Sequence, residues 1–488
     1  MISTQNVVKL FLIGAILTTI TNFPSGFTNS SINTAVVELK RFLNESYASR
    51  GWNLDETGFS FIQSTILNCW FFSQVIGSVL APILTDLYGR KIAYIIATIT
   101  MALAGVLQYL STLSMLPELL IAGRSLCALC SPLSDAALVL YLQECTPLEM
   151  RGAFSFLCEI GYALMCVVGM ILGMRSVLGY SLPRLLGSAV FPQIAFVIFL
   201  LFIPDTPKFL MIIKNDRAAA LKSLEFFQGK KEENEGILDE YLREGGEERS
   251  QRRSSLKELL CTWHLRQAVI LACMVLVLTL SFYPLLQSST FFFQKMEIPR
   301  NIAEMASTLM MTTFMFSSII GSFIIDRFPR RNLIVFSGVT ANIALSLFVV
   351  CSSVVDWAWW VKYASLIFVG GFCVTFGMVL GPTSWFVGPE LVPQRHRSSV
   401  FCFCYAFNNI LITVTNFATI PLYQYIGAYT FVPLFIIPSF FCIFYLYLYL
   451  PETKGRETHE IVESLRRKKK VPDLDVYSDI IVPGLTKY

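Results

Sequence analysis

Long apolar segments alternate with short polar ones along almost the whole chain. A helix that crosses a lipid bilayer needs about 20 mostly apolar residues, and the alternation predicts twelve such helices. We expect them at residues 8–28, 59–83, 92–111, 119–142, 153–174, 185–203, 267–290, 304–325, 332–351, 361–386, 398–420 and 429–450. The pattern therefore predicts an all-α membrane protein.

The longest internal polar stretch divides the predicted spans into two sets of six. We expect a first half at residues 1–203, a helical linker domain at 204–266, a second half at 267–450 and a polar tail at 451–488. Capping acids before good helix formers, as at Asp216, favour helices in the linker.

Composition excludes several classes of protein. Charged residues make up 15% of the 488, against about 25% in soluble domains, and the mean hydropathy is +0.59. This balance excludes a soluble or disordered chain, and the net charge of +4 does not indicate a nucleic-acid partner. Most of the 13 cysteines fall in apolar segments, so we expect buried free thiols.

The positions of Lys and Arg predict the orientation in the membrane. Most of the 38 lie in the loops on the side of the two termini, and cytoplasmic loops carry this excess. We expect both termini in the cytoplasm, with the plasma membrane as the site of the protein. Asn44-Glu-Ser46 then lies in the first external loop, as a glycosylation acceptor.

Three loop motifs occur twice, each time after the corresponding even-numbered span. Asp86-Leu-Tyr-Gly-Arg90 returns as Asp326-Arg-Phe-Pro-Arg330, at an offset of 240 positions (326 − 86). Motifs that end at Arg151 and Arg397 are offset by 246, and those that begin at Pro204 and Pro451 by 247. The near-constant offset indicates a duplicated six-helix unit, which is typical of major facilitator transporters.

These motifs resemble those of the sugar porters of the major facilitator superfamily, in particular the GLUT-type facilitative glucose transporters. Arg151-Gly, Pro204-Asp-Thr-Pro, Gly381-Pro-Thr-Ser-Trp385 and Pro451-Glu-Thr-Lys occur in the order of that family. The resemblance implies facilitative transport of a hexose or related hydroxylated solute by alternating access. It implies a sugar or polyol and membrane lipids as partners, no cofactor and no nucleic acid.

Acids and bases gather at the predicted cytoplasmic ends of the even spans. We interpret them as gating pairs that bridge the halves when the cytoplasmic side is closed, although solvated loop ends are the alternative. The residues are Asp86, Arg90, Glu144, Arg151, Asp326, Arg330, Glu390 and Arg397.

Gly381 and Pro382 are expected to interrupt span 10, because proline removes a backbone hydrogen bond and bends a helix. The resemblance implies an extracellular gate at this kink and an apolar platform for the solute at Trp385. A simple packing kink is the alternative.

Amide side chains inside spans are costly and usually face a cavity or a neighbouring helix. Asn29 and Asn33 lie four apart, on one face of span 1, and Asn408 matches a sugar-contacting Asn of the family. We expect all three to contact the solute, with hydrogen bonding between helices as the alternative.

Span 7 departs from the family pattern. The family's Gln-Gln-Leu-Ser-Gly segment is missing, Tyr283 stands where an Asn is expected, and Phe314 replaces the Asn of span 8. We expect Gln287 to supply a polar contact instead, and Pro284 to give span 7 its own break.

Two carboxyl groups lie deep in predicted spans. Glu159 replaces a sugar-contacting Gln, and Asp135 lies in span 4. They are either structural partners of groups such as Arg124, solute contacts, or the groups of a proton-linked or organic-ion carrier. Thr28 occupies the region where proton-coupled sugar porters carry an acid, which favours facilitated diffusion.

The chain offers no set of residues typical of an enzyme. Its three histidines, His264, His396 and His459, all fall in predicted cytoplasmic loops, and we expect no metal or catalytic site. A transporter-like sensor is a further alternative to transport. The basic run 466–470 follows apolar residues at helical spacing, so the tail is predicted to dock on the inner leaflet.

Overall fold

The computed structural model describes residues 4–146, 151–229, 234–250, 256–325, 327–454 and 458–467. Every regular element in these ranges is a helix. The first half contains α1 (Thr4–Thr34), α2 (Val36–Ala48), α3 (Glu56–Tyr88), α4 (Arg90–Leu113), α5 (Pro117–Cys145), α6 (Arg151–Gly173), α7 (Leu182–Ser188) and α8 (Val190–Phe202).

Four short helices link the halves: α9 (Pro207–Ile212), α10 (Arg217–Gln228), α11 (Asn234–Ser250) and α12 (Leu256–Cys261). The second half contains α13 (Trp263–Val277), α14 (Phe282–Lys295), α15 (Arg300–Ile324), α16 (Arg330–Ser353), α17 (Val361–Thr375), α18 (Gly381–Glu390), α19 (Gln394–Ile426) and α20 (Ile437–Tyr449). The tail begins with α21 (Thr458–Arg467).

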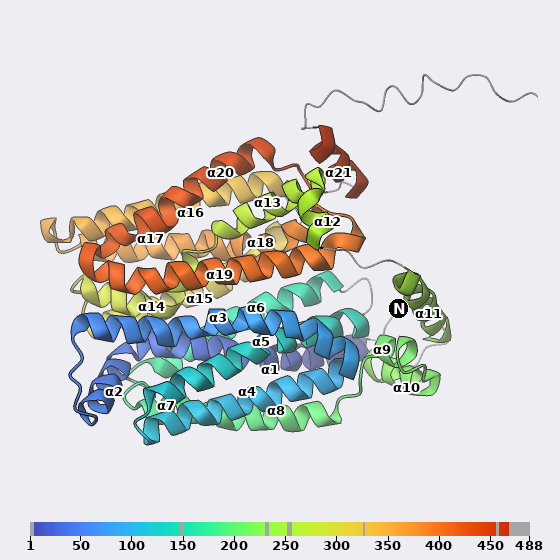
Figure 1. Cartoon of the computed structure of the whole chain (residues 1–488), viewed down its shortest axis with the longest axis horizontal. Coiled ribbons are helices and arrows are strands. Elements are labelled where there is room, and N and C mark those ends of the chain that lie inside the picture. Colours follow the sequence, from blue (N-terminus) through green and yellow to red (C-terminus); the bar gives the residue numbers. More distant parts are fainter. Residues whose placement is uncertain are drawn as a thin grey trace, which may run out of the picture.

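Eleven helical segments of the described chain are long and apolar enough to cross a membrane. Three of them join neighbouring α-helices, α7 with α8, α13 with α14 and α17 with α18, and the apolar part of α6 supplies the twelfth predicted span. The helices run roughly side by side in Figure 1, with the linker helices and α21 at one end and α2 and α7 at the other. We call the end with the linker helices and α21 the terminal end, and the end with α2 and α7 the far end.

The two halves meet along three pairs of helices. α3 packs against α19, α6 against α15, and α1 against α14. One apolar core includes residues of both halves, and the rings of Phe71 and Tyr283 meet edge-on with centroids 5.3 Å apart. The interface between the halves is therefore continuous apolar packing with polar contacts set into it.

Glycines let α1 and α6 approach closely. A Cβ atom on Gly169 would lie 2.1 Å from Ser30 Oγ, and one on Gly173 would lie 2.3 Å from the carbonyl oxygen of Ser31. Only glycine fits at such positions. Small residues generally occur where helices pack closely in membranes, because they let the backbones approach.

Span 1 was predicted too short. The predicted span ends at residue 28, but α1 continues to Thr34, and Asn29 and Asn33 are buried within it. The predicted bounds stop at residue 28, although Asn29 and Asn33 are expected on one face of this span, because the polar side chains from 28 onward face other helices rather than lipid and give no apolar signal. Residues 36–48 form the separate helix α2, which lies at the far end (Figure 1).

Spans 7 and 10 are both interrupted. Turns at residues 278–281 separate α13 from α14, and a π-helical segment, Phe376–Leu380, precedes α18. Pro284 and Pro382 lie in the first turns of α14 and α18, where proline is tolerated. The rings of Phe282 and Phe376 stack between the two interruptions with centroids 4.0 Å apart.

The tail helix α21 packs on the protein. Ile461 and Leu465, which lie at helical spacing, are buried in the core cluster that contains Leu265 and Ala268 of α13. Their apolar face is therefore covered by the second half and not free for lipid. Residues 468–470 of the basic run lie outside the described residues.

Candidate functional site

A line of amide side chains crosses the interface between the halves. Gln287 of α14 donates from Nε2 to Asn29 Oδ1 of α1 at 3.1 Å. Asn416 of α19 donates to Gln287 Oε1 at 3.2 Å. All three are buried. The structure thus brings together Asn29 and Gln287, two of the predicted contacts, but it joins them to each other.

Asn33 uses both ends of its amide. Nδ2 donates to the carbonyl oxygen of Leu286 and to Ser289 Oγ, each at 2.8 Å, and Oδ1 accepts the backbone N–H of Thr290 at 2.9 Å. These groups all belong to α14, so Asn33 joins span 1 to span 7 near the far end. A role of Asn33 in solute contact stays a prediction that requires these bonds to open.

Asn408 differs from the other amides. It lies on α19 and is 1% exposed, and neither of its amide atoms makes a hydrogen bond of normal geometry among the residues described, although the hydroxyl of Tyr283 is a polar neighbour. A buried polar group without a partner costs about 1–3 kcal/mol. This unsatisfied amide is a candidate for contact with a hydroxylated solute.

Trp385 lies on α18, directly after the interruption of span 10. Its ring centroid is 5.5 Å from that of Tyr405 and 6.0 Å from that of Phe401, both on α19. Trp385 is only partly buried, so this aromatic cluster retains an accessible face.

Glu159 reaches the second half from α6. A Cβ atom placed on Gly381 would lie 3.3 Å from Glu159 Oε1, so the carboxylate faces the interrupted helix of span 10. Asp135 accepts a hydrogen bond from Ser131 Oγ at 3.4 Å on its own helix. Arg124 instead donates to the carbonyl oxygens of Thr28 and Ile66, at 2.6 and 2.7 Å.

The predicted gating charges at the terminal end form pairs within each half. Arg90 and Glu144 lie 2.9 Å apart in the first half, and Arg330 pairs with Glu390 in the second. Bridging between the halves stays a prediction. Arg397 is exposed. The side chains of Asp86 and Arg151, and the whole of Asp326, lie outside the description.

The repeated loop motifs after spans 6 and 12 have matching structural roles. Asp205 Oδ1 accepts the backbone N–H of Lys91 at 3.2 Å, and Glu452 Oε1 accepts that of Arg330 at 2.8 Å. Each carboxylate thus caps the start of the third span of its half, where the helix dipole favours negative charge. Burial raises the pKa of the Asp205 carboxyl above its usual range.

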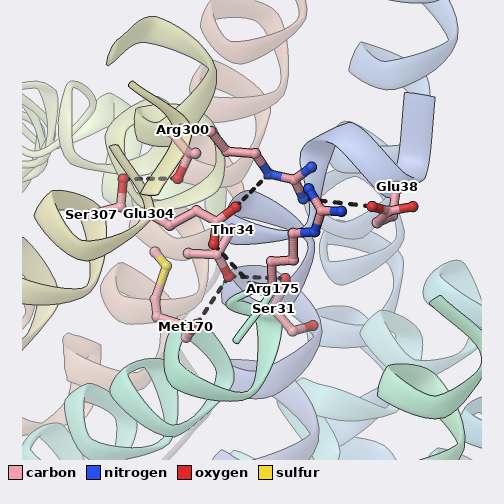
Figure 2. A network of polar contacts seen from close by, with 9 residues as sticks. Ser31, Thr34, Glu38, Met170, Arg175, Arg300, Glu304 and Ser307 are labelled. Carbon is pink, nitrogen blue, oxygen red and sulfur yellow. Dashed lines mark hydrogen bonds and ion pairs between the residues drawn. The ribbon is translucent and has the colours of Figure 1, made fainter. Parts of the chain in front are cut away.

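Sequence analysis missed a charged cluster at the far end. Arg300 lies 2.7 Å from Glu304 on α15 and 3.6 Å from Glu38 on α2 (Figure 2). The spacing of four residues between Arg300 and Glu304 is enough to predict their ion pair on one helix. The proximity of Glu38 cannot be predicted from the sequence, because it depends on how the halves pack. Asn44 lies nearby on α2, and its side chain is exposed.

A profile of the family described as "Sugar (and other) transporter" matches residues 12–465. The chain belongs to this family. The transporter is 27% identical to the facilitated glucose transporter member 1 of Gallus gallus, with 90% of this chain and 92% of that protein covered. It is 25% identical to member 9 of Homo sapiens, with 92% and 84% covered.

Solved structures agree on the fold of the transporter. The inward-open xylose transporter XylE of E. coli superimposes on this chain with a TM-score of 0.73 at 15% sequence identity. The superposition covers 94% of this chain and 99% of the XylE chain. The two sets of six spans are therefore the halves of a major facilitator fold. The protein is an integral membrane transporter of the sugar porter kind.

Proposed function

We propose that the transporter moves a hexose or a related hydroxylated solute across the plasma membrane by facilitated diffusion. The observation that carries this proposal is Asn408, a buried amide on span 11 whose donor and acceptor atoms both lack a hydrogen bond of normal geometry among the residues described, with the hydroxyl of Tyr283 as a polar neighbour. An amide nitrogen donates a hydrogen bond and an amide oxygen accepts one, and a hydroxyl group can do either. A sugar or polyol therefore satisfies both the nitrogen and the oxygen of Asn408. The names of the relatives support the same class of solute.

The solute is proposed to lie between the halves, close to the interruption of span 10. Trp385 offers an apolar face to the C–H groups of a sugar ring, and Asn408 and Gln287 offer hydrogen bonds. Glu159 comes from the other half and faces Gly381. Contacts from both halves are what alternating access requires, because the same site must be exposed to each side in turn.

The terminal end is proposed to face the cytoplasm, in agreement with the excess of Lys and Arg there. The far end is then extracellular, and exposed Asn44 is its glycosylation site. Treatment of the cell-expressed transporter with an N-glycosidase should lower its apparent mass, and Asn44→Gln should abolish this shift. A persistent shift in the variant would exclude Asn44 as the acceptor.

Counterflow tests the class of solute. Proteoliposomes are preloaded with one unlabelled compound from a panel of hexoses, pentoses and polyols, and entry of labelled hexose is followed. A transient overshoot with preloaded hexose, absent for preloaded compounds that the site does not accept, supports the proposal. Saturable binding of the hexose without any overshoot would instead favour the sensor.

A further inference from the structure

The charged cluster at the far end joins the two halves through Arg300. This residue begins α15, and its Nε donates to Glu304 Oε1 at 2.7 Å one turn later. Its Nη2 lies 3.6 Å from Glu38 Oε1 of the first half. Figure 2 shows the guanidinium between the two carboxylates. Arg300 therefore holds together acids from both halves.

Glu304 makes a second contact across the same boundary. Its other oxygen, Oε2, accepts the backbone N–H of Arg175 at 3.0 Å, at the end of span 5 in the first half. Arg300 of the second half thus pairs with Glu38 of the first half. Glu304 of the second half accepts a hydrogen bond from the backbone of Arg175 in the first half. Separation of the far ends must break both contacts.

The cluster is shielded from water, which decides how much these contacts matter. The side chains of Arg300, Glu38 and Glu304 are 21%, 15% and 4% exposed. Fully exposed ion pairs contribute little because solvent and salt screen them. Removing Arg300 takes away the cation that lies between Glu38 and Glu304, and only Arg175, which Figure 2 draws beside Arg300, remains as a cation there, so closure is weakened.

A layer of uncharged contacts lies next to the cluster and joins the same helices. Asn33 bonds to Ser289 Oγ, and the hydroxyls of Ser289 and Thr290 each donate to Ser307 Oγ of α15 at 2.8 Å. Thr34 donates to the carbonyl oxygen of Met170 on α6 at 3.0 Å (Figure 2). Arg300 and Ser307 lie on the same helix, α15, so the cluster and this uncharged layer are connected through that helix.

We propose that Arg300, with Glu38 and Glu304, is a charge latch that keeps the far end of the transporter closed. The latch opens when the far end separates to admit solute, and it forms again when the halves close. This inference rests on the alternating access of the proposed function. It adds a determinant of the balance between states at the end opposite the repeated loop motifs.

Distances between the far ends test the latch directly. Spin labels are introduced as non-canonical amino acids at Asn44 of the first half and Trp359 of the second, both exposed, because the chain has 13 native cysteines. Pulsed electron resonance then gives the populations of near and separated far ends. Arg300→Met should raise the ratio of separated to near about tenfold, the effect of about 1.4 kcal/mol.

Arg50→Met is the matched control, because Arg50 pairs with Glu118 at 2.5 Å within the first half and crosses no boundary. It should leave the distances unchanged. Glu38→Gln should shift them in the same direction as Arg300→Met, and the double variant should shift them less than the sum.

Unchanged distances in both Arg300→Met and Glu38→Gln would overturn the latch. If Arg300→Met does not fold, the distances in Glu38→Gln decide. A failure of the proposed function is distinguishable, since it would appear as the absence of hexose counterflow while the distances still respond to Arg300.

Discussion

Asn408 and Glu159 are the residues on which the proposed site depends most. One is a buried amide without a hydrogen bond of normal geometry among the residues described, and the other is a carboxylate that faces the interrupted span 10. Polar groups inside a membrane protein are retained when they bind something, because burial without a partner is costly. Both residues are therefore expected to contribute to binding rather than to folding.

Substitution of Glu159 should weaken binding of the solute. A hydrogen bond to a charged acceptor contributes about 1.5–3 kcal/mol, so Glu159→Ala should raise the dissociation constant about tenfold or more. Glu45→Ala, on the exposed face of α2, is the control and should have no effect. Equilibrium binding of labelled hexose to the purified transporter measures both. An unchanged affinity in Glu159→Ala would place the site elsewhere.

Trp385 should contribute through apolar contact. Trp385→Ala removes the ring that packs near Tyr405 and should weaken hexose binding independently of pH, since no charge is lost. Trp359→Ala is the control, because that ring is 77% exposed at the far end. Competition binding at two pH values measures the hexose affinity of both variants and of the parent. Equal affinities for Trp385→Ala and the parent would contradict the proposed platform.

At the scale of the helix, the contact between α1 and α6 depends on glycine. Gly173→Ala would place a Cβ atom 2.2 Å from Thr34 Oγ1 and should force the helices apart, at a cost of about 1–3 kcal/mol. Gly371→Ala on α17 meets nothing within 4 Å and serves as the control. Melting temperatures in detergent should fall for Gly173→Ala only. Equal melting temperatures would mean that α1 and α6 are not packed this closely.

The tail helix should be held by its apolar face rather than by its basic residues. Ile461→Asp with Leu465→Asp should detach α21 from α13, because two charges replace buried side chains. Neutralising the basic residues at 466–470 should have a smaller effect. Protease accessibility of the tail compares the variants. Release by neutralisation alone would restore the earlier prediction of docking on anionic lipid.

Membrane-spanning helices can be predicted from the sequence where a long apolar segment marks them. Long apolar segments gave the spans, and Pro382 correctly indicated the interruption of span 10. The end of span 1 was missed because Asn29 and Asn33 are polar yet buried against the other half. Arg300 and Glu38, 262 positions apart (300 − 38), meet only through the packing of the halves, so no local pattern reveals their pairing.

At the scale of the whole molecule, the charges of the terminal end are predicted to balance the latch of the far end. Arg151→Ala should favour states open at the terminal end, because a bridge of the closed form is lost. Distances between labels on α10 and α21 measure this and should lengthen, and Arg217→Ala, which pairs with Asp239 within the linker, is the control. Unchanged distances in Arg151→Ala would exclude Arg151 as a bridge between the halves.

Facilitated diffusion requires that the transporter moves its solute without a proton gradient. The direct measurement is uptake of labelled hexose into proteoliposomes, with and without an inward proton gradient. We predict equilibration to the same internal concentration in both conditions, since Thr28 stands where coupled relatives carry an acid. Accumulation above the external concentration under the gradient would contradict facilitated diffusion and would assign proton transfer to Asp135 or Glu159.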